Sequence, residues 1–185
     1  MSSIVIVSGM PRSGTSMLMK ALKDGGLEPL TDGVRTPNED NPNGYFEYEP
    51  VKNLKNDNSW MKDAIGKSVK IIYKHLNLLP TDYQYKIIFV ERNIDEIISS
   101  QKKMLINMGK KNTFSNQVLK IVFEKEIQKT KQWLLKNKFE VLYVWYNLIL
   151  SDPKKQMERV KNFVESDVDL DKMVSTVDPK LYRTK

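Results

Sequence analysis

The sequence contains no cysteine, a single histidine and no long apolar run. The lack of cysteine excludes disulfides, thiolate nucleophiles and zinc–thiolate sites, and one histidine cannot form a histidine-rich metal centre. No apolar stretch approaches the roughly 20 residues that a membrane-spanning helix needs. The first residues also lack a basic region followed by a cleavage site. We therefore expect no signal peptide and a cytoplasmic protein.

The formal net charge of +7 favours anionic partners such as nucleotides. The lysines are spread along the chain, however, and a lysine-rich solvated surface accounts for them. Because no aromatic-rich basic strand motif is present, we expect no nucleic-acid partner, and no membrane partner either. The length and the ordinary balance of apolar and charged residues predict one globular domain over residues 1–185. The sequence leaves the oligomeric state open.

Short runs rich in valine, isoleucine and aromatic residues alternate with segments of helical spacing. The predicted strands are Ile4–Ser8, Val69–Tyr73, Lys86–Val90 and Val141–Trp145, and the predicted helices are Gly14–Lys23, Ile94–Met108, Ser115–Lys136 and Pro153–Val164. This alternation predicts an α/β fold, a three-layer α/β/α sandwich around a mainly parallel sheet. The loops that follow parallel strands meet at one edge of the sheet, and ligands bind there.

The first strand leads into a glycine-bounded loop and then a helix. Gly9 and Gly14 are separated by four residues, as in the Walker A loop of P-loop NTPases. A helix that begins near Thr15 adds its unpaired amides and the positive end of its dipole, so the segment predicts an anion cradle. The chain lacks the Walker lysine, because Thr15 and Ser16 stand where Lys-Ser/Thr is expected, and Arg12 lies inside the loop instead.

The motif Pro-Arg-Ser-Gly-Thr-Ser resembles the 5′-phosphosulfate loop of the sulfotransferase superfamily, where lysine or arginine precedes Ser-Gly-Thr. The stretch YKIIFVERNIDEIISSQKKML is similar to that family's 3′-phosphate motif, because Ser100 follows Arg92 by eight positions. The stretch VLYVWYNLIL resembles a family segment whose tyrosine, here Tyr146, lies near the adenine. The resemblance implies a P-loop NTPase-like fold and a set of donor-binding residues: Gly9, Pro11, Arg12, Ser13, Gly14, Thr15, Ser16, Arg92, Ser100 and Tyr146. The family's glycine-rich C-terminal motif is absent, and Arg183 in the tail is a candidate substitute.

Three residues are candidates for the catalytic base, and the sequence does not decide among them. His75 falls where the resembling strand and loop of cytosolic sulfotransferases carry their catalytic histidine, although Tyr73 replaces the family's lysine. Asp32 stands where tyrosylprotein sulfotransferases carry an acidic base. Residues 32–50 are rich in proline, glycine and asparagine, so we predict a long functional loop on the acceptor side. Its aromatic residues can wall a pocket, and Glu47 can act as a base.

The resemblance implies a sulfotransferase that moves a sulfuryl group from 3′-phosphoadenosine 5′-phosphosulfate to a hydroxyl or amine of a small-molecule or carbohydrate acceptor. The product would be 3′,5′-adenosine bisphosphate, Arg12 would stabilise the charge on the leaving phosphate, and no metal would be required. One alternative is a P-loop kinase of a small metabolite, which would want the missing lysine. Another is a non-catalytic protein that binds the nucleotide.

Overall fold

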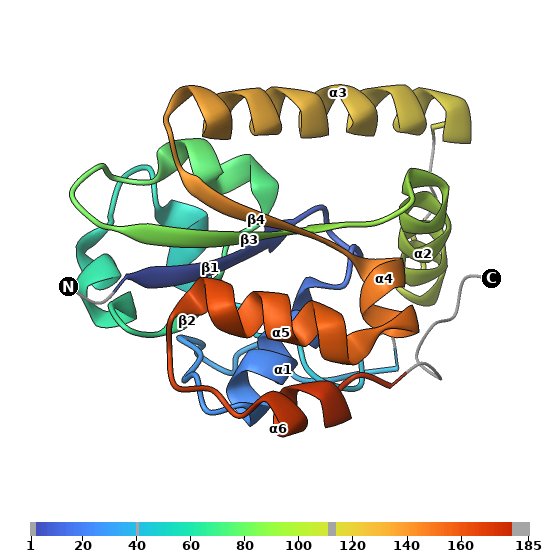
Figure 1. Ribbon diagram of the computed structural model, residues 1–185. Helices are drawn as coiled ribbons and strands as arrows, with labels where there is room; N and C mark the ends of the chain where they lie inside the picture. The colour runs from blue at the N-terminus through green and yellow to red at the C-terminus, as the bar shows by residue number, and fades with distance from the viewer. Residues whose placement is uncertain (1–2, 40, 111–113, 179–185) are drawn as a thin grey trace.

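Four parallel strands form the sheet of the computed structural model, which describes residues 3–39, 41–110 and 114–178. The strands are β1 (Ile4–Gly9), β2 (Ser68–Lys70), β3 (Tyr85–Glu91) and β4 (Glu140–Trp145), and their order is β2-β1-β3-β4 (Figure 1). Every residue of β1 is buried, as expected for a strand covered on both faces. The predicted parallel sheet is confirmed.

Helices cover both faces of this sheet. They are α1 (Thr15–Asp24), α2 (Ile94–Asn107), α3 (Asn116–Lys136), α4 (Tyr146–Ser151), α5 (Pro153–Val164) and α6 (Leu170–Ser175). One face is covered by α3, and the opposite face by α1, α5 and α6 (Figure 1). Successive β3 residues belong to the two different cores, because Ile87 packs toward the α3 side and Ile88 toward the α1 side. The predicted three-layer sandwich is therefore confirmed.

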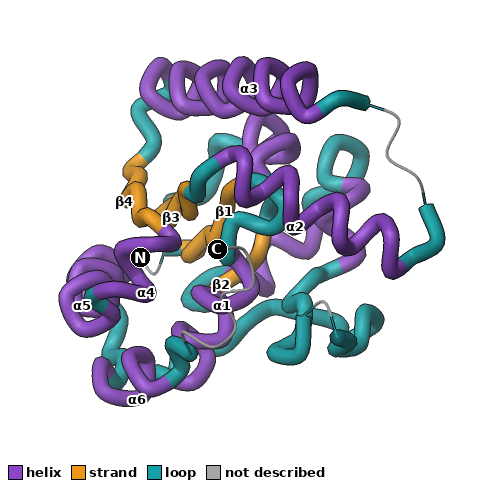
Figure 2. Tube along the Cα trace, turned by 90° about the vertical axis from the view of Figure 1, so that its right-hand side faces the viewer, coloured by secondary structure: helices purple, strands orange, loops and turns teal. Residues whose placement is uncertain are grey.

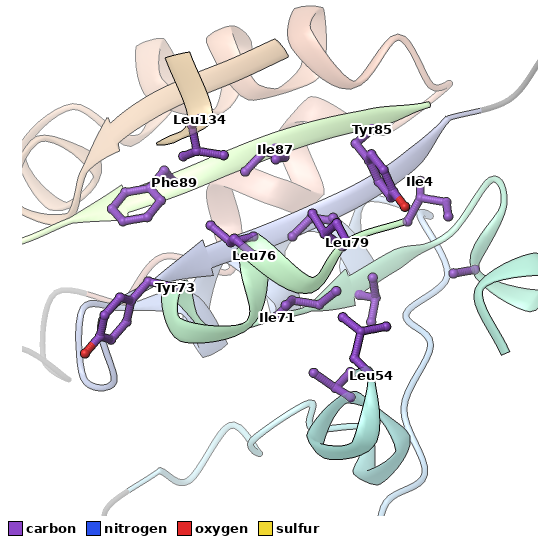
Figure 3. Close-up of a cluster of buried hydrophobic side chains, with 14 of the residues drawn as sticks. Ile4, Leu54, Ile71, Tyr73, Leu76, Leu79, Tyr85, Ile87, Phe89 and Leu134 are labelled. Atoms are coloured by element: carbon purple, nitrogen blue, oxygen red, sulfur yellow. The ribbon is translucent and has the colours of Figure 1, made fainter. Parts of the chain in front are cut away.

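The second strand is shorter than predicted. It ends at Lys70, and a 3-10 helix, η3 (Tyr73–Leu78), takes up the rest of the apolar run. Ile71 still donates a backbone hydrogen bond to Val7, after which the chain leaves the sheet. Tyr73 and Leu76 of η3 are buried in the same core cluster as Phe89 (Figure 3). A short apolar run cannot distinguish a strand from a buried helical turn, which is why the prediction ran too far.

The sequence also missed several short elements. These are α4, α6 and two more 3-10 helices, η1 (Glu49–Asn53) and η2 (Ser59–Ala64). From Asp32 to Tyr48 the described residues form neither helix nor strand, in agreement with the predicted loop. The outer edge of β2 is covered by the chain itself, because Leu30 donates to the Ser68 carbonyl and Ser68 donates to the Glu28 carbonyl. Within the described ranges, no helix is long and apolar enough to cross a bilayer.

The helix α3 is fixed to the core by few side chains. Leu134 is its one fully buried residue, and it lies against Ile87 and Phe89 of β3 (Figure 3). The next residue, Leu135, is 80% exposed. These neighbours on one helix allow the contribution of burial to be measured with helix propensity held constant.

We expect Leu134→Ala to lower the free energy of unfolding by about 2–5 kcal/mol, because it leaves a cavity in the core. Leu135→Ala is the matched control and should change the free energy by less than about 0.5 kcal/mol. Urea denaturation of both variants measures the difference. Equal losses in the two variants would contradict the assigned packing of α3.

Candidate active site

A cavity of about 300 Å³ opens at the carboxyl edge of the sheet. Its walls come from the loop after β1, the segment 35–47, the end of β2, Arg92 after β3, the helix α2 and Tyr146 after β4. Such a position at the strand ends is where open α/β folds bind ligands. The volume lies at the lower end of the range of small-molecule sites.

The loop between β1 and α1 has three residues with positive φ angles. Gly9, Arg12 and Gly14 have φ angles of 148°, 74° and 107°. The amide of Ser13 donates to the Met10 carbonyl at 3.0 Å, and α1 then begins at Thr15. The first amides of a helix have no intrahelical partner, so the start of α1 at the cavity can donate to an anion.

Glycine is required at position 14 by the positive φ angle and also by the space available there. A Cβ atom at this position would lie 2.4 Å from Cδ2 of Tyr146, because the tyrosine ring packs directly on the loop. The same ring lies under the Arg92 guanidinium, 4.4 Å from its Cζ atom. Tyr146 is almost fully buried by these contacts.

Two arginines connect the loop with the segment after β3. Arg12 donates from Nε to Ser100 Oγ at 3.0 Å, and Arg92 donates from Nη1 to the Arg12 carbonyl at 3.1 Å. Arg92 also forms an ion pair with Glu96, with Nε 2.8 Å from Oε2. The residues of both predicted motifs therefore meet at one cavity, although they are separated by more than 70 positions in the chain.

Lys70 enters the cavity from the end of β2. Its Nζ atom donates to Ser16 Oγ at 3.2 Å and to the Tyr45 carbonyl at 2.9 Å. Asn41 donates to the same Ser16 oxygen at 2.9 Å. Burial lowers the pKa of Lys70 to about 8, with Glu47 opposing the shift.

The structure brings most of the predicted residues to this cavity. Those that line it are Pro11, Arg12, Gly14, Thr15, Ser16, Glu47, Arg92, Ser100 and Tyr146. Gly9 and Ser13 do not line the cavity. They pack against each other within the loop, where an added Cβ on Gly9 would lie 2.6 Å from Ser13 Oγ. Arg183 lies outside the described residues.

The three candidate bases differ in position. Glu47 lines the cavity and pairs with Arg35 at 2.8 Å, and the Arg35 guanidinium stacks on the Tyr45 ring. Asp32 is exposed and is not in the lining; slight desolvation acts to raise its pKa, but hydrogen bonds from the backbone amides of Glu49 and Val34 outweigh this and lower it. His75 is also not in the lining, and it lies in η3, where burial lowers its pKa.

Several lining residues were not identified from the sequence, above all Lys70, Arg35 and Lys103. Lys70 left a signal, because a lysine interrupts an otherwise apolar strand just before the strand ends. Arg35 and Lys103 left none that separates them from surface residues. The lining is cationic as a result, and in the described part of the chain no cluster of acidic or histidine side chains could hold a metal ion.

Comparisons with known proteins identify the family and the fold. A family model described as the sulfotransferase domain matches residues 2–181. The fold is similar to the sulfotransferase domain from the curacin biosynthetic pathway, with a TM-score of 0.55 and 13% identity over 96% of this chain and 78% of that chain. It is also similar to a sulfotransferase from Alicyclobacillus acidocaldarius, with a TM-score of 0.54 and 15% identity over 98% of this chain and 88% of that chain. A search of curated proteins gave no match.

The lowered pKa of Lys70 predicts a pH-dependent stability. Between pH 8 and 10.5 the unfolded chain keeps a proton on this lysine that the folded chain has released. The cost of burying the charged lysine is therefore complete below pH 8 and disappears as the pH rises through this window. The free energy of unfolding of the wild type minus that of Lys70→Met should rise from about pH 8 to about pH 10, as measured by urea denaturation. A difference that stays flat would show that burial does not perturb Lys70.

Proposed function

We propose, because the chain belongs to the sulfotransferase domain family, that it transfers a sulfuryl group from 3′-phosphoadenosine 5′-phosphosulfate to a hydroxyl or amine of a small acceptor. One observation carries the proposal. The loop Gly9–Ser16 and the pair Arg92 and Ser100 border a single cavity and are joined through Arg12. Two anion sites a short distance apart suit a nucleotide that has phosphate groups at two positions of its ribose.

The residues present fit such a donor. The amides at the start of α1, with the hydroxyls of Thr15 and Ser16, would bind its 5′-phosphate. Arg92 and Ser100 would bind its 3′-phosphate. The ion pair with Glu96 holds the Arg92 guanidinium in place before binding, so less conformational freedom is lost when the phosphate arrives.

The donor supplies an activated sulfuryl group, so the chain's own task is to position the reactants and to offset charge. Arg12 lies between the two anion sites, where its guanidinium would stabilise charge that builds on the 5′-phosphate. Lys70 reaches the same end of the loop through Ser16 and would add a second positive charge. Both cations are fixed by hydrogen bonds, so little reorganisation is needed during the reaction.

The acceptor side is formed by the segment 35–47. Glu47 is the one member of the three candidate bases that lines the cavity, and it would take the acceptor proton. Arg35 orients its carboxylate through the ion pair and is itself held on the Tyr45 ring. Asp32 and His75 do not line the cavity and would therefore have no direct part in the proton transfer.

A kinase of a small metabolite is the competing function, and the position of Lys70 is the observation that favours it. Its ammonium group lies 3.2 Å from Ser16 Oγ, so it offers the loop a charge that the Walker lysine would otherwise supply. Against this, Arg92 and Ser100 would have no phosphate to bind in ATP. A protein that only binds the nucleotide remains a further alternative, and a transfer assay distinguishes it from an enzyme.

Ligand binding should discriminate between these functions. We expect 3′,5′-adenosine bisphosphate to raise the free energy of unfolding by roughly 2.7 kcal/mol at a hundredfold excess over Kd, without magnesium. ATP with magnesium should stabilise the protein much less, since it lacks the 3′-phosphate. Thermal-shift titrations measure both effects. The reverse ranking would favour the kinase.

Two arginine variants should separate turnover from binding. Arg12→Ala should lower the rate of sulfuryl transfer by ~10²–10³ with a smaller effect on donor affinity. Arg92→Ala should instead weaken the binding of 3′,5′-adenosine bisphosphate, measured by calorimetry.

The matched control is Arg159→Ala. Arg159 lies on α5, where it donates to Gln156, and it is not part of the cavity lining. This variant should keep both properties. Near-normal turnover of Arg12→Ala would contradict the role of Arg12, and an unchanged affinity of Arg92→Ala would remove the second anion site.

A further inference from the structure

The segment 97–123, which runs from α2 into the first turns of α3, combines positive charge with exposed apolar side chains. Between Glu96 and Glu124 the sequence has five lysines and neither aspartate nor glutamate. Four of these lysines are in the described part of the chain, and Lys103 and Lys110 are exposed. An ordinary solvated surface of this chain mixes both charges, so the absence of acidic residues over this length sets the segment apart.

The same segment holds most of the large apolar side chains that the described residues expose. They are Ile106, Met108, Phe114, Val118, Ile121 and Val122, with exposed fractions from 46% to 73%. Scattered single apolar residues on a surface are normal, but six within one acid-free segment are not explained by chance exposure. We call these six residues the apolar set.

This segment lies beside the cavity. Ser100, Lys103 and Met104 of α2 line the cavity, and Met108 follows Met104 by one helical turn. The helix α2 and the N-terminal end of α3 lie at the same end of the molecule, which is the right side of Figure 1 and faces the reader in Figure 2. Whatever binds the α2 part of the apolar set is therefore held next to the cavity.

The chemistry of the segment favours one kind of partner. Asp95 neutralises Lys120 through an ion pair, and the other described lysines of the segment leave an excess of positive charge. A second copy of the chain would bring together two such surfaces, which repel each other. A nucleic acid would use the lysines but has no need of aliphatic side chains beside them. A bilayer with anionic lipids uses both, since the lysines are attracted to the headgroups and the apolar side chains insert between them.

We propose that the segment with the apolar set docks the protein onto an anionic lipid surface. Docking would present the cavity to acceptors carried at that surface. The docking itself does not depend on the transfer reaction, whereas its consequence for acceptors rests on the proposed function. It departs from the expectation of no membrane partner, which rested on the lack of a spanning run and on the spread of the lysines along the chain.

Cosedimentation with lipid vesicles tests the proposal on the full chain without donor. We expect the fraction bound to vesicles of phosphatidylcholine with phosphatidylserine to exceed that bound to phosphatidylcholine alone by roughly tenfold or more at low salt. The double variant Lys102→Glu/Lys110→Glu should abolish this difference. Neither lysine lines the cavity.

A second pair of variants tests the apolar contribution. Ile121→Ser/Val122→Ser should lower binding to the anionic vesicles several-fold, because two inserting side chains are lost. Leu135→Ser is the matched control, since Leu135 is exposed on the same helix but outside the apolar set. For charge, the control is Lys154→Glu/Lys155→Glu on α5, which covers the other face of the sheet. Both controls should bind as the wild type does.

The outcomes separate the proposal from its competitors. No preference for anionic vesicles would overturn it, as would an equal loss of binding in the Lys154/Lys155 control, which would indicate diffuse charge. Binding to RNA or to an acidic protein without vesicle binding would also overturn it. Thermal shifts with 3′,5′-adenosine bisphosphate, measured on each variant, show that the chain is folded and report separately on the proposed donor site.

Discussion

The pairing of β1 with β3 is the constraint on which the site depends. These strands run in parallel over six residue pairs, from Ile4 with Tyr85 to Gly9 with Val90. Their ends bring the loop Gly9–Ser16 beside Arg92, so the Arg92 guanidinium can reach the Arg12 carbonyl and Arg12 can reach Ser100. The buried apolar side chains that hold the sheet together fix the distance between these two elements, which are remote in sequence and are proposed to bind anions.

The sequence predicted what depends on short-range signals. The glycine spacing and Arg12 located the loop, the spacing of Arg92 and Ser100 located the second cluster, and the apolar runs located the four strands. It failed where burial from a distant element decides the backbone. Tyr73 and Leu76 read as strand, but the core beneath α3 accepts them from a 3-10 helix. Lys70 was passed over because its importance comes from Ser16 and Tyr45, which only the folded chain brings to it.

The lining of the cavity comes partly from regular elements and partly from an irregular segment of the chain. The proposed donor side is built from strand ends and helix starts, whose backbone is fixed by the sheet. The proposed acceptor side is built from residues 35–47, where the described chain has no regular structure and position is set by side chains such as Arg35 on Tyr45. Loop residues can be exchanged without disturbing the sheet, so this division would let the proposed acceptor side vary while the strand ends stay fixed.

The hydroxyl of Ser16 receives two donors, one from Lys70 and one from Asn41. A serine oxygen has two lone pairs and a single proton, so both lone pairs are engaged in the folded chain. The proton must then point elsewhere, and Ser16 is left able to give a hydrogen bond but not to take another. Three segments far apart in sequence thereby set the polarity of one O–H group, and that polarity matches an oxyanion and rejects a ligand that could only donate.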